Sequence, residues 1–148
     1  MLAVGETIEN FELTDQTGTS RSLSELLTAG PIVLFFYPKA MTPGCTKESC
    51  HFRDLGSEFE AVGAQPVGIS ADKVEKQAKF DSVNSLGMPL LSDGDRKVAA
   101  MFGVKRPGPL MNKRATFVIG QDSKVLGAFS SELNMARHAD EALELLKK

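Results

Sequence analysis

The sequence is poor in cysteine, with only two among 148 residues. Two thiols are too few for the disulfide framework of a small secreted domain, and a chain of this length buries roughly 68–70% of its unfolded surface without one. No secretory signal is visible, because the first residues, MLAVGETIEN, contain neither a basic segment nor a long apolar run. These absences favour a reducing, cytoplasmic setting.

Long apolar runs and an excess of basic residues are also missing. The run PIVLFFY is far shorter than the roughly 20 residues of a membrane-spanning helix, and it is typical of a buried strand. The formal net charge is −2, and no basic stripe of the kind that binds nucleic acids is present. We therefore expect neither a membrane nor a nucleic acid as a partner.

The chain contains no internal repeat, low-complexity segment or linker, so we expect one domain over residues 1–148. Residues 10–27 predict a strand, a turn and a short helix that begins with a capping box of Ser22 and Glu25. The expected elements that follow are strands at 31–38, 65–72 and 88–93, a helix after the cysteine segment, a helix capped by Asp72 with Glu75, a short helix at 96–102, a strand pair around a turn at 120–124, and a final amphipathic helix.

This order of elements predicts the fold class. Strand, helix and strand come early, and a hairpin and a helix come late, which implies an α/β domain with a mixed central sheet and helices on both faces. The order matches a thioredoxin-like fold with an N-terminal β-hairpin extension.

Both cysteines lie in the segment TPGCTKESC, at positions 45 and 50. Thr42 and Pro43 are typical of the N-cap and the first position of a helix. Cys45 then falls in the first turn, where free N–H groups and the helix dipole favour a thiolate. The same geometry places Cys45 roughly 60° from the centre of the apolar face of this helix and Cys50 about 160° from it, so Cys45 should point into a pocket and Cys50 towards solvent. That face would carry Phe52, Leu55, Phe59 and Val62.

The dipole alone does not produce a thiolate. A thiol of pKa about 8.5 is only about 3% ionised at pH 7, and half ionisation needs about 2 kcal/mol, against about 0.3–1 kcal/mol from a helix terminus. A reactive Cys45 therefore needs a nearby cation. The candidates are Lys39, Lys47, Arg53 and Arg114.

Several interpretations of the cysteine pair remain open from spacing alone. The two thiols could be inert packing residues, since buried free cysteine is common. A zinc site needs four ligands, and besides the C-x4-C spacing the chain offers only His51 and the distant His138. A thioredoxin-type dithiol requires C-x-x-C, which is absent.

The segment FFYPKAMTPGCTKESCHFRD resembles the active-site segment of the peroxiredoxins, specifically the Q type, also called bacterioferritin comigratory proteins. It carries the P-x-x-x-T-x-x-C frame as Pro38, Thr42 and Cys45, with Cys50 five residues further on. The segments VGETIENFELTDQTG, PVGISAD, LLSDGDRKVAAMFGV and KRATFVI fall in the order of the family, so the resemblance covers nearly the whole chain. Two departures are a missing proline in ETIENF and the pair Ala40-Met41, which makes the rim of the pocket more apolar.

The resemblance implies a thiol peroxidase that reduces hydrogen peroxide and organic hydroperoxides. Cys45 would be the peroxidatic cysteine, which becomes a sulfenic acid, and Cys50 the resolving cysteine, which closes an intramolecular disulfide. Thr42 and Arg114 would hold the peroxide, and Pro38 would shield the thiolate. Glu48 fits a T-x-E-x-C pattern of the family; without the resemblance it is an acidic residue that favours the first helical turn.

The resemblance implies no metal and no organic cofactor. It implies a thioredoxin-like dithiol as the partner that returns the electrons, and a monomer. Two other functions are weighed against it: a binding or scaffold protein of the thioredoxin fold with structural cysteines, and a thiol–disulfide reductase.

Overall fold

Seven strands and six helices follow one another in a computed structural model that describes residues 1–148. The strands are β1 (Glu12–Thr14), β2 (Ser20–Ser22), β3 (Ile32–Phe36), β4 (Gln65–Ser70), β5 (Leu90–Ser92), β6 (Ala115–Ile119) and β7 (Val125–Ser130). The helices are α1 (Leu23–Leu26), α2 (Pro43–Asp54), α3 (Gly56–Ala61), α4 (Val74–Asn84), α5 (Lys97–Met101) and α6 (Met135–Leu146).

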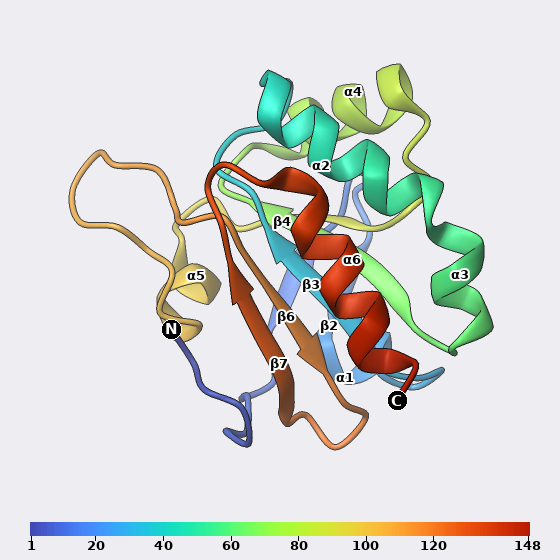
Figure 1. The fold of residues 1–148 in the computed structure, drawn as a ribbon. Helices are drawn as coiled ribbons and strands as arrows, with labels where there is room; N and C mark the ends of the chain where they lie inside the picture. The colour runs from blue at the N-terminus through green and yellow to red at the C-terminus, as the bar shows by residue number, and fades with distance from the viewer.

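All seven strands form one mixed sheet in the order β2-β1-β5-β4-β3-β6-β7 (Figure 1). The central strand β3 pairs in parallel with β4 and antiparallel with β6. The predicted mixed sheet with helices on both faces is confirmed. The predicted N-terminal hairpin is also present, and it extends the sheet because β1 pairs with β5 as well as with β2.

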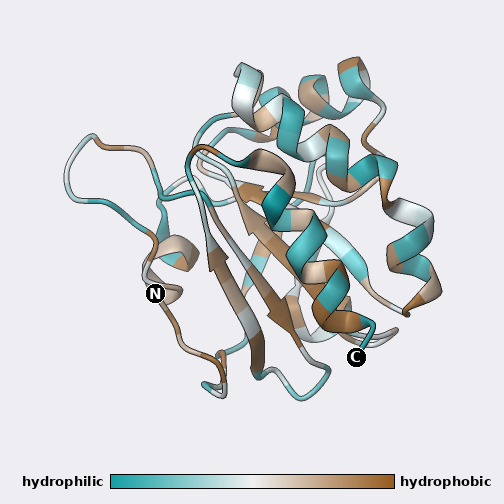
Figure 2. Ribbon diagram, in the orientation of Figure 1, coloured by the Kyte–Doolittle hydropathy of each residue, from teal (hydrophilic) through white to brown (hydrophobic).

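The sheet separates two apolar cores. Alternate residues of β3 point to opposite faces, as the period of a strand requires. Leu34 and Phe36 belong to the core beneath α1 and α5, whereas Val33 and Phe35 belong to the core beneath α2, α3, α4 and α6. In Figure 2 the central strands are largely apolar, and α6 alternates between apolar and polar bands as an amphipathic helix does. Both faces of β3 are therefore covered, which explains its uninterrupted apolar sequence.

Local signals at two helix starts are confirmed. Ser22 is the N-cap of α1 and its hydroxyl accepts a hydrogen bond from the Glu25 N–H at 3.2 Å. The capping box is only half formed, because the Glu25 carboxylate accepts from Arg21 Nε at 3.0 Å and not from the Ser22 N–H. Thr42 is the N-cap of α2, and Pro43 occupies the first helical position. No helix in the structure has both the length and the apolar character needed to cross a bilayer.

Two local expectations are wrong. The apolar face expected from Phe52 to Val62 is divided, because α2 ends at Asp54 and α3 starts at Gly56, and Leu55 between them departs from helical geometry. Glycine is a poor helix former, which accounts for a break at this point. Asp72 also does not cap the next helix: the N-cap of α4 is Lys73, without a side-chain hydrogen bond.

Candidate active site around Cys45

The first turn of α2 holds Cys45 at its third position, as predicted. The first helical hydrogen bond runs from the Thr46 N–H to the Thr42 carbonyl at 2.9 Å, so the N–H groups of Gly44 and Cys45 precede the hydrogen-bonded ladder. The Thr42 hydroxyl does not cap the helix; it donates to the Lys39 carbonyl at 2.7 Å. Its oxygen therefore retains the ability to accept a hydrogen bond.

The loop between β3 and α2 is fixed by Asp72. Its Oδ2 accepts hydrogen bonds from the Ala40 N–H and from the Ser70 hydroxyl, both at 2.7 Å. Met41, next in the loop, has φ of 70°, a left-handed conformation that a side chain rarely adopts without support from its surroundings. Asp72, which the sequence suggested as a helix cap, thus positions the loop that leads into the turn of Cys45.

A buried network of hydrogen bonds supports the loop between β3 and α2. The Tyr37 hydroxyl donates to Gln77 Oε1, and Gln77 Nε2 donates to the Ser70 hydroxyl at 3.0 Å and to the Leu91 carbonyl at 2.9 Å. Burial raises the pKa of Tyr37 well above its ordinary range, so this phenol stays neutral. The network ties β3, β4, β5 and α4 together beneath the loop.

Arg114 is the cation beside Cys45. Its Nη2 lies 3.4 Å from Cys45 Sγ, and both residues are buried. The antiparallel pairing of β3 with β6 places Phe36 opposite Ala115, which brings the start of β6 to the end of β3. Burial opposes the charge of Arg114, but the neighbouring Glu48 and Cys45 raise the guanidinium pKa above its usual value.

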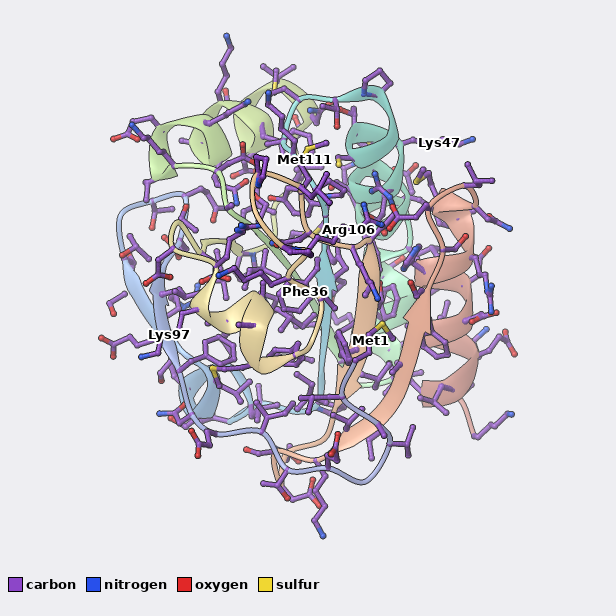
Figure 3. The ribbon with its side chains drawn as sticks, turned by 90° about the vertical axis from the view of Figure 1, so that its left-hand side faces the viewer. Met1, Phe36, Lys47, Lys97, Arg106 and Met111 are labelled. Atoms are coloured by element: carbon purple, nitrogen blue, oxygen red, sulfur yellow. The ribbon has the colours of Figure 1, made fainter.

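The other three candidate cations are not placed in this way. Lys39 and Lys47 are exposed. In Figure 3 Lys47 extends outward from α2, away from the buried end of β3 marked by Phe36. Arg53 donates to the Asp54 carboxylate and to the Asn84 carbonyl. Only Arg114 therefore provides the charge that the first turn of α2 lacks.

Glu48 fixes the orientation of the guanidinium. Its Oε1 accepts from Arg114 Nη1 at 2.8 Å, and its side chain is fully buried. Burial raises the pKa of Glu48 to about 7, against the opposing effect of Arg114. The interpretation of Glu48 as an acidic residue of the first turn is wrong, because it lies one turn later and faces the interior.

His138 completes this buried cluster, and only its residue type could have indicated it from the sequence. It lies in α6, with Nδ1 2.8 Å from the Thr116 hydroxyl and 3.6 Å from Glu48 Oε2, and with Nε2 2.8 Å from the Ser131 carbonyl. His51, the other zinc candidate, pairs instead with Asp140 at 2.8 Å. No group of three or more His, Cys, Asp or Glu side chains is arranged to hold a metal ion.

The site is crowded at Gly44. A Cβ atom at this position would come within 3.2 Å of both Arg114 Nη2 and the Met135 methyl group. Met41 on the loop side is exposed. Pro38 is half-buried and follows two residues after β3 ends.

Cys50 lies in the same helix as Cys45, and both thiols are free. Its side chain is only half-exposed, since its sulfur lies 3.8 Å from Asn84 Oδ1 and packs beside the core under α2. The expectation that Cys50 points fully into solvent is therefore only partly met. A cavity of about 610 Å³ lies away from Cys45, beside Phe52 and the segment at residues 86–88. Cys45 does not line that cavity.

Comparison with known proteins identifies the family of the chain. A family model described as the AhpC/TSA family matches residues 4–127. The crystal structure of peroxidoxin BcpB from Mycobacterium tuberculosis is 60% identical in sequence and superposes with a TM-score of 0.96 over 99% of this chain and 97% of that chain. Peroxiredoxin Bcp of Escherichia coli K12 is 36% identical over 153 residues, 99% of this chain and 97% of the relative.

A third similar protein is the bacterioferritin comigratory protein of Xanthomonas campestris, whose structure was determined in a study of its alkyl peroxide reduction activity. It is 32% identical, with a TM-score of 0.86 over 93% of this chain and 90% of that chain. The chain therefore belongs to the AhpC/TSA family and, within it, is a peroxiredoxin of the Q type, the class of peroxidase that its cysteine segment resembles.

Proposed function

We propose that Cys45 is the peroxidatic residue of this peroxiredoxin. Its thiolate attacks one peroxide oxygen, the O–O bond breaks, and the leaving oxygen takes up a proton to depart as water or an alcohol. Cys45 is left as a sulfenic acid. The observation that supports this role most directly is the guanidinium of Arg114 at 3.4 Å from a buried sulfur in the first turn of a helix.

Three neighbours have separate roles in this step. Arg114 Nη2 and the N–H groups at the start of α2 stabilise the thiolate and the negative charge that develops on the leaving oxygen. The Thr42 hydroxyl, which already donates to Lys39, accepts the hydrogen of the bound peroxide. Pro38, half-buried between β3 and α2, screens the sulfur from water.

Cys50 resolves the sulfenic acid. Its thiolate attacks the Cys45 sulfur, the S–O bond breaks, and the disulfide forms while the leaving hydroxide takes up a proton and departs as water. Because both cysteines lie in α2, the helix has to open for this step. Asn84, next to the Cys50 sulfur, is released at the same time.

The substrates of this chain are hydrogen peroxide and small alkyl hydroperoxides. Alkyl peroxide reduction is the activity studied in the Xanthomonas campestris relative, and the apolar rim formed by Met41 and Met135 suits an alkyl group. A thioredoxin-like dithiol in a reducing, cytoplasmic setting returns the electrons, and the protein acts as a monomer.

A coupled assay tests this assignment. NADPH consumption is followed with thioredoxin, thioredoxin reductase and a peroxide, first with the wild-type protein and then with Cys45→Ser. Peroxide-dependent turnover that disappears in Cys45→Ser supports the proposal. Peroxide-independent reduction of a disulfide substrate would indicate a thiol–disulfide reductase, and no turnover in either assay would indicate a scaffold role.

A further inference from the structure

The hydrogen bonds of His138 determine where its protons can be. The Ser131 carbonyl can only accept, so Nε2, 2.8 Å away, carries a hydrogen and donates it. In a neutral imidazole Nδ1 is then an acceptor, and the Thr116 hydroxyl at 2.8 Å is its donor.

This tautomer leaves Glu48 Oε2 without a donor. The oxygen is buried, has no hydrogen-bond partner, and faces His138 Nδ1 at 3.6 Å. If Glu48 were ionised and His138 neutral, two acceptors would face each other in a buried site. A buried charged acceptor without a donor is costly, whereas a proton on either atom turns the contact into a favourable one.

We propose that Glu48 and His138 hold one proton between them at and below neutral pH, and that this proton leaves the positive charge of Arg114 available to Cys45 and the bound peroxide. The second half rests on the proposed function of Cys45. Glu48 and His138 are positioning residues here, since they act through Arg114 and not on the peroxide.

The charge balance around Arg114 explains the effect. With the shared proton present, the Glu48–His138 pair is neutral overall, and the guanidinium is compensated mainly by the Cys45 thiolate. When the proton leaves, the Glu48 carboxylate neutralises Arg114 at 2.8 Å. Stabilisation of the charge on the leaving oxygen then weakens.

The other ionisable groups around the pair come from every element packed against it. They are Arg114 just before β6, Glu132 before α6, Arg137 of α6 and Cys45 of α2. Burial raises the pKa of Glu48 to about 7, with Glu132 acting in the same direction and Arg114 in the opposite one. Burial lowers the pKa of His138, and the positive charge of Arg114 lowers it further. Both shifts favour the proton on Glu48.

The first test locates the proton in the wild-type protein, and two variants serve only to assign the infrared band. Nitrogen-15 NMR reports the protonation of the two His138 nitrogens, and infrared spectroscopy reports a protonated carboxyl group at pH 6. We expect a carboxyl band that is absent in Glu48→Gln and present in the exposed control Glu58→Gln. An imidazolium at His138 would also place the proton within the pair. A neutral His138 facing an ionised Glu48 at pH 6 would overturn the proposal.

The second test measures the effect on chemistry. The rate of peroxide reduction is divided by the thiolate fraction of Cys45, which ultraviolet absorbance reports. We expect this rate to fall about tenfold in the wild type as the shared proton leaves above neutral pH, and to fall less than about twofold in Glu48→Gln, which keeps a neutral group beside Arg114. Equal pH profiles in the two proteins would overturn the link to Arg114.

Failure of this proposal is distinguishable from failure of the proposed function. If Cys45→Ser loses activity while Glu48→Gln keeps the wild-type pH profile, only the link between the shared proton and Arg114 is wrong. If Cys45→Ser still consumes peroxide, the assignment of the peroxidatic cysteine is wrong, and the NMR and infrared results still decide the state of the pair.

Discussion

We expect the reactivity of Cys45 to depend most on Arg114, whose Nη2 lies 3.4 Å from the sulfur. We expect Arg114→Ala to slow both alkylation of Cys45 and its reaction with peroxide at pH 7, by about a hundredfold or more, since a charged donor to the reacting atoms is lost. Stopped-flow kinetics measures both rates. Lys47→Ala is the matched control because Lys47 is an exposed cation on α2, the helix of Cys45. An equal loss of both rates in Lys47→Ala would contradict the role of Arg114.

Loss of Arg114 also leaves Glu48 buried without its guanidinium partner. A thermal unfolding curve of Arg114→Ala is therefore needed beside the kinetics. Because Glu48 can take up a proton, the variant should be most stable at mildly acidic pH. A folded Arg114→Ala variant that retains the wild-type rates would show that Arg114 has no role in the reaction.

The two cysteines should respond differently to substitution. Cys45→Ser removes the nucleophile and should abolish peroxide consumption. Cys50→Ser should consume about one equivalent of peroxide in the absence of an added thiol and stop at a sulfenic acid, because the second thiol of the disulfide is missing. A dimedone adduct identified by mass spectrometry measures this product. A correctly folded Cys50→Ser without an initial reaction would show that the roles are assigned wrongly.

In the proposed reaction, helix α2 is the element that has to change its structure. Two residues five apart on an ideal helix have Cα atoms about 8.7 Å apart and point about 140° away from each other. A disulfide needs Cα atoms within about 6.8 Å. Since both cysteines lie in α2, disulfide formation has to unwind its first turns, and Gly44 weakens that part of the helix by up to about 1 kcal/mol relative to alanine.

Phe52 sets the limit of this unwinding. It is fully buried and stacks on Phe35 with ring centroids 4.1 Å apart and on Phe59 at 5.8 Å. Its release would remove a large aromatic side chain from the core beneath α2. The turns before Phe52 can therefore open at lower cost than the turn that contains it.

Hydrogen exchange measures this change directly. We expect amide exchange across residues 43–51 to rise on oxidation by peroxide and to return to its reduced level with dithiothreitol. Oxidised Cys50→Ser, which cannot form the disulfide, is the matched control and should keep its protection. Equal protection of the wild type in both redox states would show that the disulfide forms without unwinding α2.

The stability of the whole molecule should depend on the buried carboxyl of Glu48. Its pKa rises from an ordinary 4.5 to about 7 on folding, so the native state holds a proton that the unfolded chain has already released. The free energy of unfolding therefore falls as pH rises from 4.5 to 7 and does not change further through this group above that window. Relative to Glu48→Gln, the free energy of unfolding of the wild type should fall by on the order of 1–3 kcal/mol between pH 4.5 and 7.

Urea unfolding at pH 5, 6, 7 and 8 measures the difference between the two proteins. Glu58→Gln serves as the control because Glu58 is exposed on α3, and its stability should run parallel to that of the wild type. A difference between wild type and Glu48→Gln that stays constant with pH would show that Glu48 is ionised throughout.

The sequence by itself determined the features that depend on neighbouring residues. Thr42 and Pro43 define the start of α2, the apolar run at 31–38 defines β3, and the spacing places Cys45 in the first turn. These features follow from local backbone geometry and from side-chain periodicity, which a short stretch of sequence contains in full. The P-x-x-x-T-x-x-C frame is equally local, which is why the family could be predicted from it.

Only the tertiary structure decided which distant residues meet Cys45. Arg114 is 69 residues away from it in sequence, and its place beside the sulfur depends on the register of β3 with β6. Asp72 reaches the loop at Ala40 because parallel strands β3 and β4 end at the same edge of the sheet. His138 meets Glu48 because α6 packs across α2. Such contacts are set by sheet register and helix packing, which depend on the burial of the whole core. The sequence therefore shows that these side chains are present but does not show which residues they contact.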